Sequence, residues 1–316
     1  MATATGTAPG KIILIGEHAV VYGHPAVAIP VKGVSTRVEA ELGRGADVTV
    51  VSDDLPVIFA NAKRREKATE SLKRVARLVA GVFGEDVSGL TLKVQSDVPV
   101  RCGLGSSAAL CVATIRALCG LFGRSVGAEE VSDLAYEAEK IFHATPSGID
   151  NSVVAFEQPV YFTKRKGPKP IAAERTSFEF LIADTGLFSS TSQVVNDVRR
   201  FRAGDRARYD SLFWEIGSMA SVAREVLRRG NRPELGMCMN RNHELLREVG
   251  VSCQEIEALV DAAREAGAAG AKLSGAGRGG SVIVLLGEDG ERLGVSAALK
   301  QSGAREVYET QVGPEE

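Results

Sequence analysis

The spacing of hydrophobic and polar residues changes several times along the chain. Short apolar runs bounded by turn residues, such as Ile12–Ile15 and Thr91–Val94, predict buried strands, and we expect strands to dominate the first hundred residues. Ala108–Phe122 is apolar at almost every position apart from Arg116, which predicts a buried helix. In Glu129–Phe142, apolar residues recur at helical spacing, which predicts a helix with one buried face.

The second half of the chain favours an α+β fold. A strand is predicted at Gln158–Phe162, and the Lys- and Pro-rich stretch Lys164–Arg175 is predicted to be a linker. Beyond it we expect strands at Phe178–Asp184, Ser281–Leu286 and Glu306–Gln311, and helices at Val194–Arg202, Arg208–Arg229, Glu234–Val249, Cys253–Ala266 and Leu293–Gln301. A chain of 316 residues suits about two domains, and we expect them at residues 1–170 and 171–316.

Composition narrows the class of protein only slightly. The chain has 38 Lys and Arg residues against 40 Asp and Glu, and a net charge of −2 gives no general attraction to nucleic acid or acidic membranes. Five cysteines without a Cys-x-x-Cys pair indicate a reducing compartment, so we expect a cytoplasmic protein. Residues 1–7 are predicted to be a loose tail rather than a signal peptide, and no apolar stretch approaches the roughly 18 residues of a membrane span.

Glu139 lies at the edge of the apolar face predicted for residues 129–142. An unpaired buried carboxylate is unfavourable, so we expect an ion pair, a hydrogen-bond network or a metal ion beside it. The alternative is a carboxylate near the end of a helix that simply pairs with Lys140 or His143.

A second acid, Asp150, follows shortly after this predicted helix. Pro146 is expected to end the helix and Gly148 permits a tight turn, which would present Asp150 near Glu139. With two acids in one place, one can hold a cation while the other accepts a proton.

The segment Pro99–Ala109, here called the first glycine loop, joins a predicted strand to a predicted buried helix. Helix N-termini bind anions, glycines let the backbone approach a phosphate closely, and serine hydroxyls can reach a phosphate or its magnesium ion. The loop is not a Walker A motif, because no lysine follows its glycines. The alternative is structural: Gly103 and Gly105 make a turn, and Ser106 or Ser107 caps the helix.

The segment Lys272–Gly280, the second glycine loop, contains a formal Gly-x-Gly-x-x-Gly match at Gly275, Gly277 and Gly280. A dinucleotide-binding fingerprint requires a strand before the glycines and a helix after them. Here a helix is predicted before the loop and a strand after it, which argues against a dinucleotide oxidoreductase. The loop could close over a ligand or pack against another loop, and a long flexible connector is the alternative.

The N-terminal run from Ala8 to Gly23 places Lys11 at one end of a predicted buried strand and Glu17 and His18 at the other. A lysine can neutralise charge on a phosphoryl group during its transfer. Alone this signal is weak, because lysines beside strands are usually solvated and a lone histidine is more often structural.

Taken in order, these three segments resemble the three motifs of the GHMP small-molecule kinases, and their spacing covers the chain from residue 8 to about 284. The first motif, together with the run Pro146–Asn151, is similar to the branch that acts on mevalonate. The resemblance implies a ribosomal-protein-S5-like N-terminal domain, a ferredoxin-like C-terminal domain and a site between them. It also implies transfer of the γ-phosphoryl group of ATP to the C5 hydroxyl of mevalonate, a step in isoprenoid precursor synthesis.

The resemblance assigns roles to individual residues. It makes Asp150 the catalytic base and Lys11 its partner, with Ser107 and Glu139 holding Mg²⁺. The implied ATP-binding residues are Pro99, Gly103, Leu104, Gly105, Ser106, Ser107 and Ala108, and the implied substrate-binding residues are Glu17, His18, Ser147, Gly148, Thr191 and Gly277. The expected partners are mevalonate and ATP, without nucleic acid or a membrane, and a homodimer is compatible with the sequence.

The chain departs from the family pattern at two places. Arg278 stands where many members have glycine, and it either reaches a phosphate or faces solvent. In the segment 184–192, Ser189 and Ser192 replace two basic residues of the animal-type enzymes, while Ser190 and Thr191 keep hydroxyls that can approach substrate. Inhibition by isoprenoid diphosphates, which would depend on the missing charges, is left open.

Two other functions stay open on the sequence. A related kinase could act on phosphomevalonate or on another hydroxyl of mevalonate, because the shape of the pocket is not legible from the sequence. A ligand sensor without activity is the second alternative, and the retention of Lys11, Glu139 and Asp150 argues against it.

Overall fold

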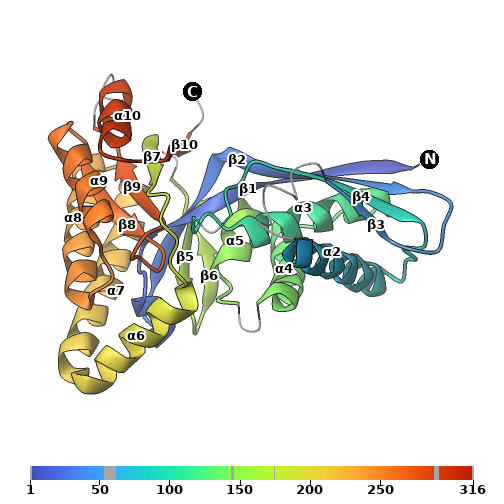
Figure 1. Ribbon diagram of the computed structural model, residues 1–316, viewed down its shortest axis with the longest axis horizontal. Coiled ribbons are helices and arrows are strands. Elements are labelled where there is room, and N and C mark those ends of the chain that lie inside the picture. The colour runs from blue at the N-terminus through green and yellow to red at the C-terminus, as the bar shows by residue number, and fades with distance from the viewer. Residues whose placement is uncertain are drawn as a thin grey trace. The chain divides into compact units, whose positions relative to one another are not determined.

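The computed structural model describes residues 2–52, 62–100, 102–143, 146–173, 175–287 and 292–314. As predicted, the fold is mixed α+β, and the described residues form two sheets (Figure 1). Contacts divide the chain into a first unit of Met1–Lys11, Val34–Val100 and Leu104–Glu157, and a second unit of Ile12–Gly33, Arg101–Gly103 and Gln158–Glu316. Residues 158–170 therefore group with the second unit, whereas the sequence placed a domain boundary at residue 170; the two domains stay a prediction.

The larger sheet follows the order β3-β4-β2-β5-β6, with β1 paired to β2. Its strands are β1 (Thr3–Ile15), β2 (Ala26–Leu42), β3 (Thr49–Val51), β4 (Leu90–Ser96), β5 (Val160–Thr163) and β6 (Gly167–Pro170). β2 pairs antiparallel with β4 along Thr36–Leu42, and at its other end it pairs with β5. Alternating burial along β4 explains this placement, because Leu90, Leu92 and Val94 all face the core.

The described helices of the first unit are α2 (Ala62–Phe83), α3 (Ser106–Leu121), α4 (Ala128–Phe142) and α5 (Ile149–Phe156). α3 is buried along most of its length and packs against α2, α4 and α5 (Figure 1). A helix that is apolar on nearly all sides is stable in water only when neighbours cover it, and this central position provides them.

The second unit contains the sheet β10-β7-β9-β8. Its strands are β7 (Phe178–Asp184), β8 (Gly270–Ser274), β9 (Ser281–Leu285) and β10 (Glu306–Val312), and its helices are the 3-10 helix η1 (Ala19–Tyr22), α6 (Thr191–Gly204), α7 (Arg206–Arg229), α8 (Arg232–Val249), α9 (Gln254–Glu265) and α10 (Arg292–Gln301). α8 and α9 pack against β8 (Figure 1). The predicted helices and strands after residue 177 are therefore confirmed, with shifts of a few residues at their ends.

Two features of secondary structure were not predicted from the sequence. The first hundred residues include the long helix α2, whose buried Leu72, Val75, Ala76 and Val79 recur at helical spacing. The expected linker contains β6, which pairs with β5 in a hairpin. β6 carries two prolines because it pairs only with β5 and lies at the edge of the sheet.

Two predictions are corrected, one for the N-terminal residues and one for the second glycine loop. Thr3–Thr7, predicted to be a loose tail, belongs to β1. The second glycine loop follows the strand β8 rather than a helix, so its glycines connect two antiparallel strands. The Rossmann arrangement is still excluded, because a strand rather than a helix follows them.

None of the five cysteines, all of which lie in the described part of the chain, forms a disulfide bond. No helix in the described part of the chain is long and apolar enough to cross a membrane.

Candidate active site

Lys11 and Asp150 form an ion pair in the first unit. The Lys11 Nζ lies 3.0 Å from Asp150 Oδ2; the lysine side chain is 7% exposed and the aspartate side chain 31%. The buried ammonium is therefore neutralised by a carboxylate that still reaches solvent. The backbone N–H of Lys11 also donates to the carbonyl of Leu104 at 2.9 Å, which ties β1 to the first glycine loop.

Asp150 was expected on a turn, but it lies in the first turn of α5. Gly148 precedes this helix with φ +85°, a left-handed conformation that glycine adopts without strain. The positive end of the helix dipole favours an ionised carboxylate at this position. Ser147 is exposed, and its hydroxyl accepts a hydrogen bond from the backbone N–H of Ile149 at 3.3 Å.

Glu139 is buried on α4 and contacts the start of α3. The hydroxyl of Ser107 donates to Glu139 Oε1 at 3.3 Å and lies 3.1 Å from the Nε2 of His143. Lys140 instead contacts Glu137, so the predicted pairing of Glu139 with Lys140 is wrong.

Burial and, to a smaller extent, the negative charge of Asp150 raise the pKa of Glu139, while Lys11 and the Ser107 hydrogen bond lower it; together these effects bring the pKa of Glu139 to about 8. Asp150 is thus close enough to Glu139 to influence it electrostatically, as the sequence predicted. A cation bound beside Glu139 would favour its ionised form.

Ser107 and Glu139 fit Mg²⁺. Both present oxygen atoms, the ligands that this hard cation prefers. Among the described residues no group of three or more His, Cys, Asp and Glu side chains is placed to hold a metal. A site with few protein ligands is typical of magnesium in nucleotide enzymes, where phosphate and water oxygens complete the coordination.

The first glycine loop leads directly into α3. Gly105 is the N-cap of this helix, with φ +73°, and no side chain caps it. Ser106 and Ser107 therefore lie inside the helix, and the predicted capping role is wrong. Uncapped N–H groups at this end are free to bind an anion.

Gly105 is required for the position of Lys11. A Cβ added at Gly105 would lie 2.7 Å from the Cγ of Lys11, so any larger residue would displace the lysine side chain. The other residues predicted to bind ATP are Pro99, Gly103, Leu104 and Ala108, of which Leu104 and Ala108 are buried and support the loop from within.

Cys102 makes polar contacts within the second unit that the sequence did not predict. Within the second unit, the hydroxyl of Ser281 donates to the Cys102 carbonyl at 2.8 Å, and the Cys102 thiol donates to Asp184 at 3.3 Å. Arg305 pairs with the same aspartate at 2.5 Å. No sequence signal could have identified these partners, because they are separated from Cys102 by more than 80 residues.

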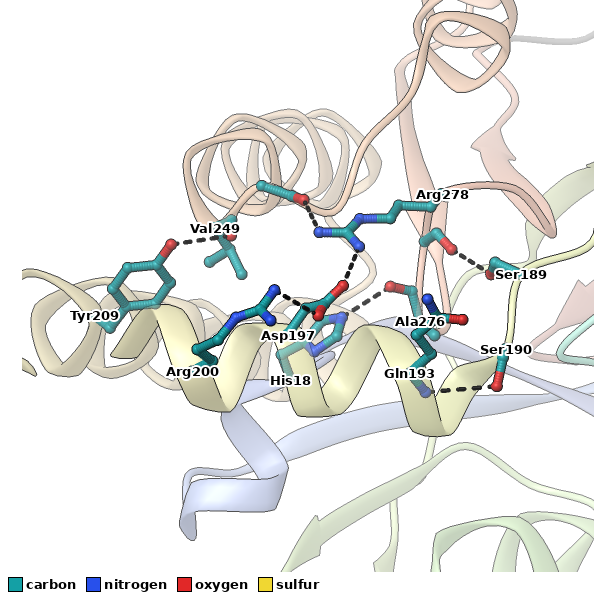
Figure 2. Close-up of polar contacts among 12 residues, drawn as sticks. His18, Ser189, Ser190, Gln193, Asp197, Arg200, Tyr209, Val249, Ala276 and Arg278 are labelled. Carbon is teal, nitrogen blue, oxygen red and sulfur yellow. Dashed lines mark hydrogen bonds and ion pairs between the residues drawn. The ribbon is translucent and has the colours of Figure 1, made fainter. Parts of the chain in front are cut away.

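Glu17 and His18 are both buried in the second unit. Glu17 forms an ion pair with Lys272 of β8, and neither side chain is more than 1% exposed. Burial raises the pKa of Glu17, while the charge of Lys272 opposes the rise. His18 Nε2 lies 2.9 Å from the carbonyl of Ala276 (Figure 2), and burial lowers the pKa of His18, which favours a neutral ring that donates from Nε2.

Thr191 and Gly277 lie in neighbouring segments of the second unit. Thr191 is exposed as the first residue of α6, and Ser190 caps this helix by accepting from the N–H of Gln193 (Figure 2). Gly277 has φ +82°, and a Cβ there would collide with the carbonyl of Val251.

Arg278 is held by contacts within the second unit. It does not simply face solvent, because its Nη1 lies 2.6 Å from Asp197 Oδ2 and its Nη2 donates to the carbonyl of Gly250 at 3.3 Å (Figure 2). Asp197 neutralises the charge of the Arg278 guanidinium. This pair could not be predicted from local sequence patterns, because its members are 81 residues apart.

The pKa of Glu139 predicts a dependence of stability on pH. In unfolded chains a glutamate releases its proton near pH 4.5, whereas folded Glu139 keeps it until about pH 8. Without metal or nucleotide, its contribution to the free energy of unfolding should therefore decrease between these values, by at most about 1.4 kcal/mol per pH unit. The free energy of unfolding in urea is measured at several pH values for the wild type and for Glu139→Gln. The difference between the two proteins at each pH gives the contribution of Glu139.

Glu137→Gln is the matched control for this experiment, because Glu137 is an exposed neighbour on the same helix. The control should keep the pH dependence of the wild type. Identical pH profiles for wild type and Glu139→Gln would contradict the raised pKa.

Comparisons with known proteins show the family of the chain. Residues 70–158 match the family described as GHMP kinases N terminal domain, and residues 223–305 match GHMP kinases C terminal. The chain is 35% identical to mevalonate kinase of Thermococcus sibiricus, covering 95% of this chain and 94% of the relative, and 33% identical to that of Pyrococcus horikoshii, covering 94% and 92%.

A solved structure described as L. major mevalonate kinase in complex with R-mevalonate has a TM-score of 0.85 and 32% identity, and the match covers 98% of this chain and 96% of that one. Similarity at this level extends over nearly the whole of the compared chains, so it includes both the fold and the segments that carry the charged residues. The protein therefore belongs to the mevalonate kinases of the GHMP kinase family.

Proposed function

We propose that the protein transfers the γ-phosphoryl group of ATP to the C5 hydroxyl of mevalonate, forming 5-phosphomevalonate and ADP. The observation that carries this proposal is the ion pair between Lys11 and Asp150, which joins a partly exposed carboxylate to a buried ammonium beside the first glycine loop. The substrate is inferred from the relatives named mevalonate kinase.

In the proposed reaction, Asp150 accepts the proton of the C5 hydroxyl as its oxygen bonds to the γ-phosphorus of ATP. The bond from that phosphorus to the bridging oxygen breaks, and ADP leaves with the electron pair. Lys11 pairs with Asp150 before the reaction and offsets negative charge at the transferring group. Phosphoryl transfer depends mainly on alignment and charge neutralisation, which these groups provide.

Ser107 and Glu139 are the residues we propose for Mg²⁺. When bound, the ion neutralises phosphate charge and orients the nucleotide. The N–H groups at the start of α3 are proposed to contact the phosphates, with Gly103 and Gly105 allowing close approach.

We propose that mevalonate is recognised by the other residues named from the family resemblance: Glu17, His18, Ser147, Gly148, Thr191 and Gly277. Their chemistry suits a hydroxylated acid, because the neutral ring of His18 and the hydroxyls of Ser147 and Thr191 can form hydrogen bonds with it. The buried Glu17 Oε2 has no hydrogen-bond partner in the described part of the chain, which leaves an acceptor for a substrate hydroxyl.

The test is a panel of alcohols incubated with ATP and magnesium, with products identified by mass and by phosphorus NMR. Mevalonate should give a product with phosphate on C5, while galactose and homoserine should react poorly. Polar groups that lose their partners penalise a wrong substrate strongly, by about 10,000-fold or more in favourable cases.

Two results would redirect the assignment to a neighbouring kinase. One is phosphate on C3 of mevalonate, and the other is a kcat/KM for 5-phosphomevalonate that exceeds the value for mevalonate. Absence of any phosphorylated product across the panel would instead support a ligand sensor.

A further inference from the structure

Arg278 adopts a backbone conformation that arginine normally avoids. Its φ is +54°, and the surrounding glycines Gly275, Gly277, Gly279 and Gly280 also have positive φ. A side chain is disfavoured in this region because its Cβ approaches a backbone carbonyl oxygen. An arginine is tolerated in this conformation when the contacts of its side chain offset the backbone strain, so the contacts of Arg278 are the feature to explain.

The contacts of Arg278 lead to two other segments of the second unit. Its guanidinium donates to Asp197 of α6 at 2.6 Å, and its backbone N–H donates to the carbonyl of Val251 at 2.7 Å. The side chains of Arg278 and Asp197 are 32% and 20% exposed, so the pair is largely shielded from water. A charge-assisted hydrogen bond in such surroundings is stronger than one on an open surface.

A second contact holds the segment just before α6 to the same loop. The hydroxyl of Ser189, which stands where animal-type relatives have a basic residue, donates to the carbonyl of Gly277 at 2.6 Å (Figure 2). Thr191 lies between Ser189 and Asp197 in sequence. The start of α6 is therefore attached to the second glycine loop on both sides of Thr191.

We propose that Arg278 is a positioning residue: through Asp197 it holds the first turns of α6 on the second glycine loop, and it thereby sets the position of Thr191 for binding the hydroxylated substrate. This inference rests on the proposed function, because Thr191 and Gly277 are both assigned to mevalonate there. Arg278 itself contacts neither ATP nor substrate in this proposal.

Arg278→Gly is the informative variant, because glycine relieves the backbone strain while it removes the ion pair. We expect the KM for mevalonate to rise about 5- to 20-fold, with kcat and the KM for ATP unchanged within about twofold. A general loss of structure would instead lower kcat and affect both substrates.

Arg200→Gln is the matched control. Arg200 contacts the other oxygen of Asp197 at 2.9 Å, but it lies on α6 itself and its side chain is 74% exposed. The control removes a charge from the same carboxylate without releasing the glycine loop, and it should leave the KM for mevalonate unchanged.

Asp197→Asn provides a double-mutant cycle with Arg278→Gly. If the two residues act through each other, each variant should raise the KM for mevalonate similarly, and the double variant should resemble either one. Multiplied effects in the double variant would show that they act separately, which would overturn the proposal.

Hydrogen exchange of residues 191–198 gives a readout that does not depend on activity. Exchange in this segment should be faster in Arg278→Gly than in the wild type and unchanged in Arg200→Gln. Unchanged exchange together with an unchanged KM for mevalonate would overturn the proposal. If the wild type fails to phosphorylate mevalonate, the proposed function is wrong and so is the role in mevalonate binding, while the exchange data still report whether Arg278 holds α6.

Discussion

Replacing Asp150 with asparagine should lower kcat by about 100- to 10,000-fold, the usual loss when a general base is removed. The amide has nearly the shape of the carboxylate, but it cannot take the proton of the attacking hydroxyl. Asp150 is the residue to change because its carboxylate is partly exposed, whereas its partner Lys11 is buried. Steady-state kinetics with mevalonate and MgATP measures the effect.

Binding of MgATP should change little in Asp150→Asn, and calorimetry can check this. Asp133→Asn is a suitable control, because Asp133 is an exposed aspartate on α4. The variant should also shift the titration of Glu139 to lower pH, because the charge of Asp150 helps to raise the pKa of Glu139. A fall in kcat of less than about threefold would exclude Asp150 as the base.

Gly105→Ala should lower kcat by about 100-fold, because the added methyl group displaces the side chain of Lys11. The distance of 2.7 Å from the new Cβ to the Lys11 Cγ is too short for any carbon contact, so the lysine must move away. A displaced ammonium no longer pairs with Asp150 in the same geometry, and small misplacements near the reacting groups have large effects on rate. The measurement is kcat at saturating concentrations of both substrates.

Gly103→Ala separates this effect from backbone strain. Gly103 also has positive φ, +79° against +73° at Gly105, but a Cβ there meets nothing within 4 Å. Both variants therefore strain the loop, and only Gly105→Ala pushes on Lys11. Equal losses of kcat in the two variants would attribute the effect to the loop backbone and not to the lysine.

Much of the fold followed from local patterns in the sequence. The buried helix α3 was predictable because apolar residues occupy nearly all of its positions, and β7 because an apolar run is bounded by turn residues. α2 was missed although its apolar positions recur at helical spacing, which makes that error one of interpretation. β8 and α5 are short, and short apolar segments are ambiguous between helix and strand.

Some residues of the candidate active site could also be predicted from the sequence. The motifs identified Lys11, Glu139 and Asp150 as charged groups beside buried elements, and the structure brings Lys11 to Asp150 and Ser107 to Glu139. Their catalytic roles stay predictions, which the variants above test.

The sequence by itself determined the class of fold, the order of the three motifs and the family, because these depend on residue types and on spacing along the chain. The tertiary structure alone decided which charges neutralise one another: Lys272 with Glu17, and Arg278 with Asp197. The members of each pair lie in segments that are distant along the chain, 255 and 81 residues apart. Burial strengthens an ion pair only after folding has removed water from around it, and no local pattern records which distant residue will then be opposite.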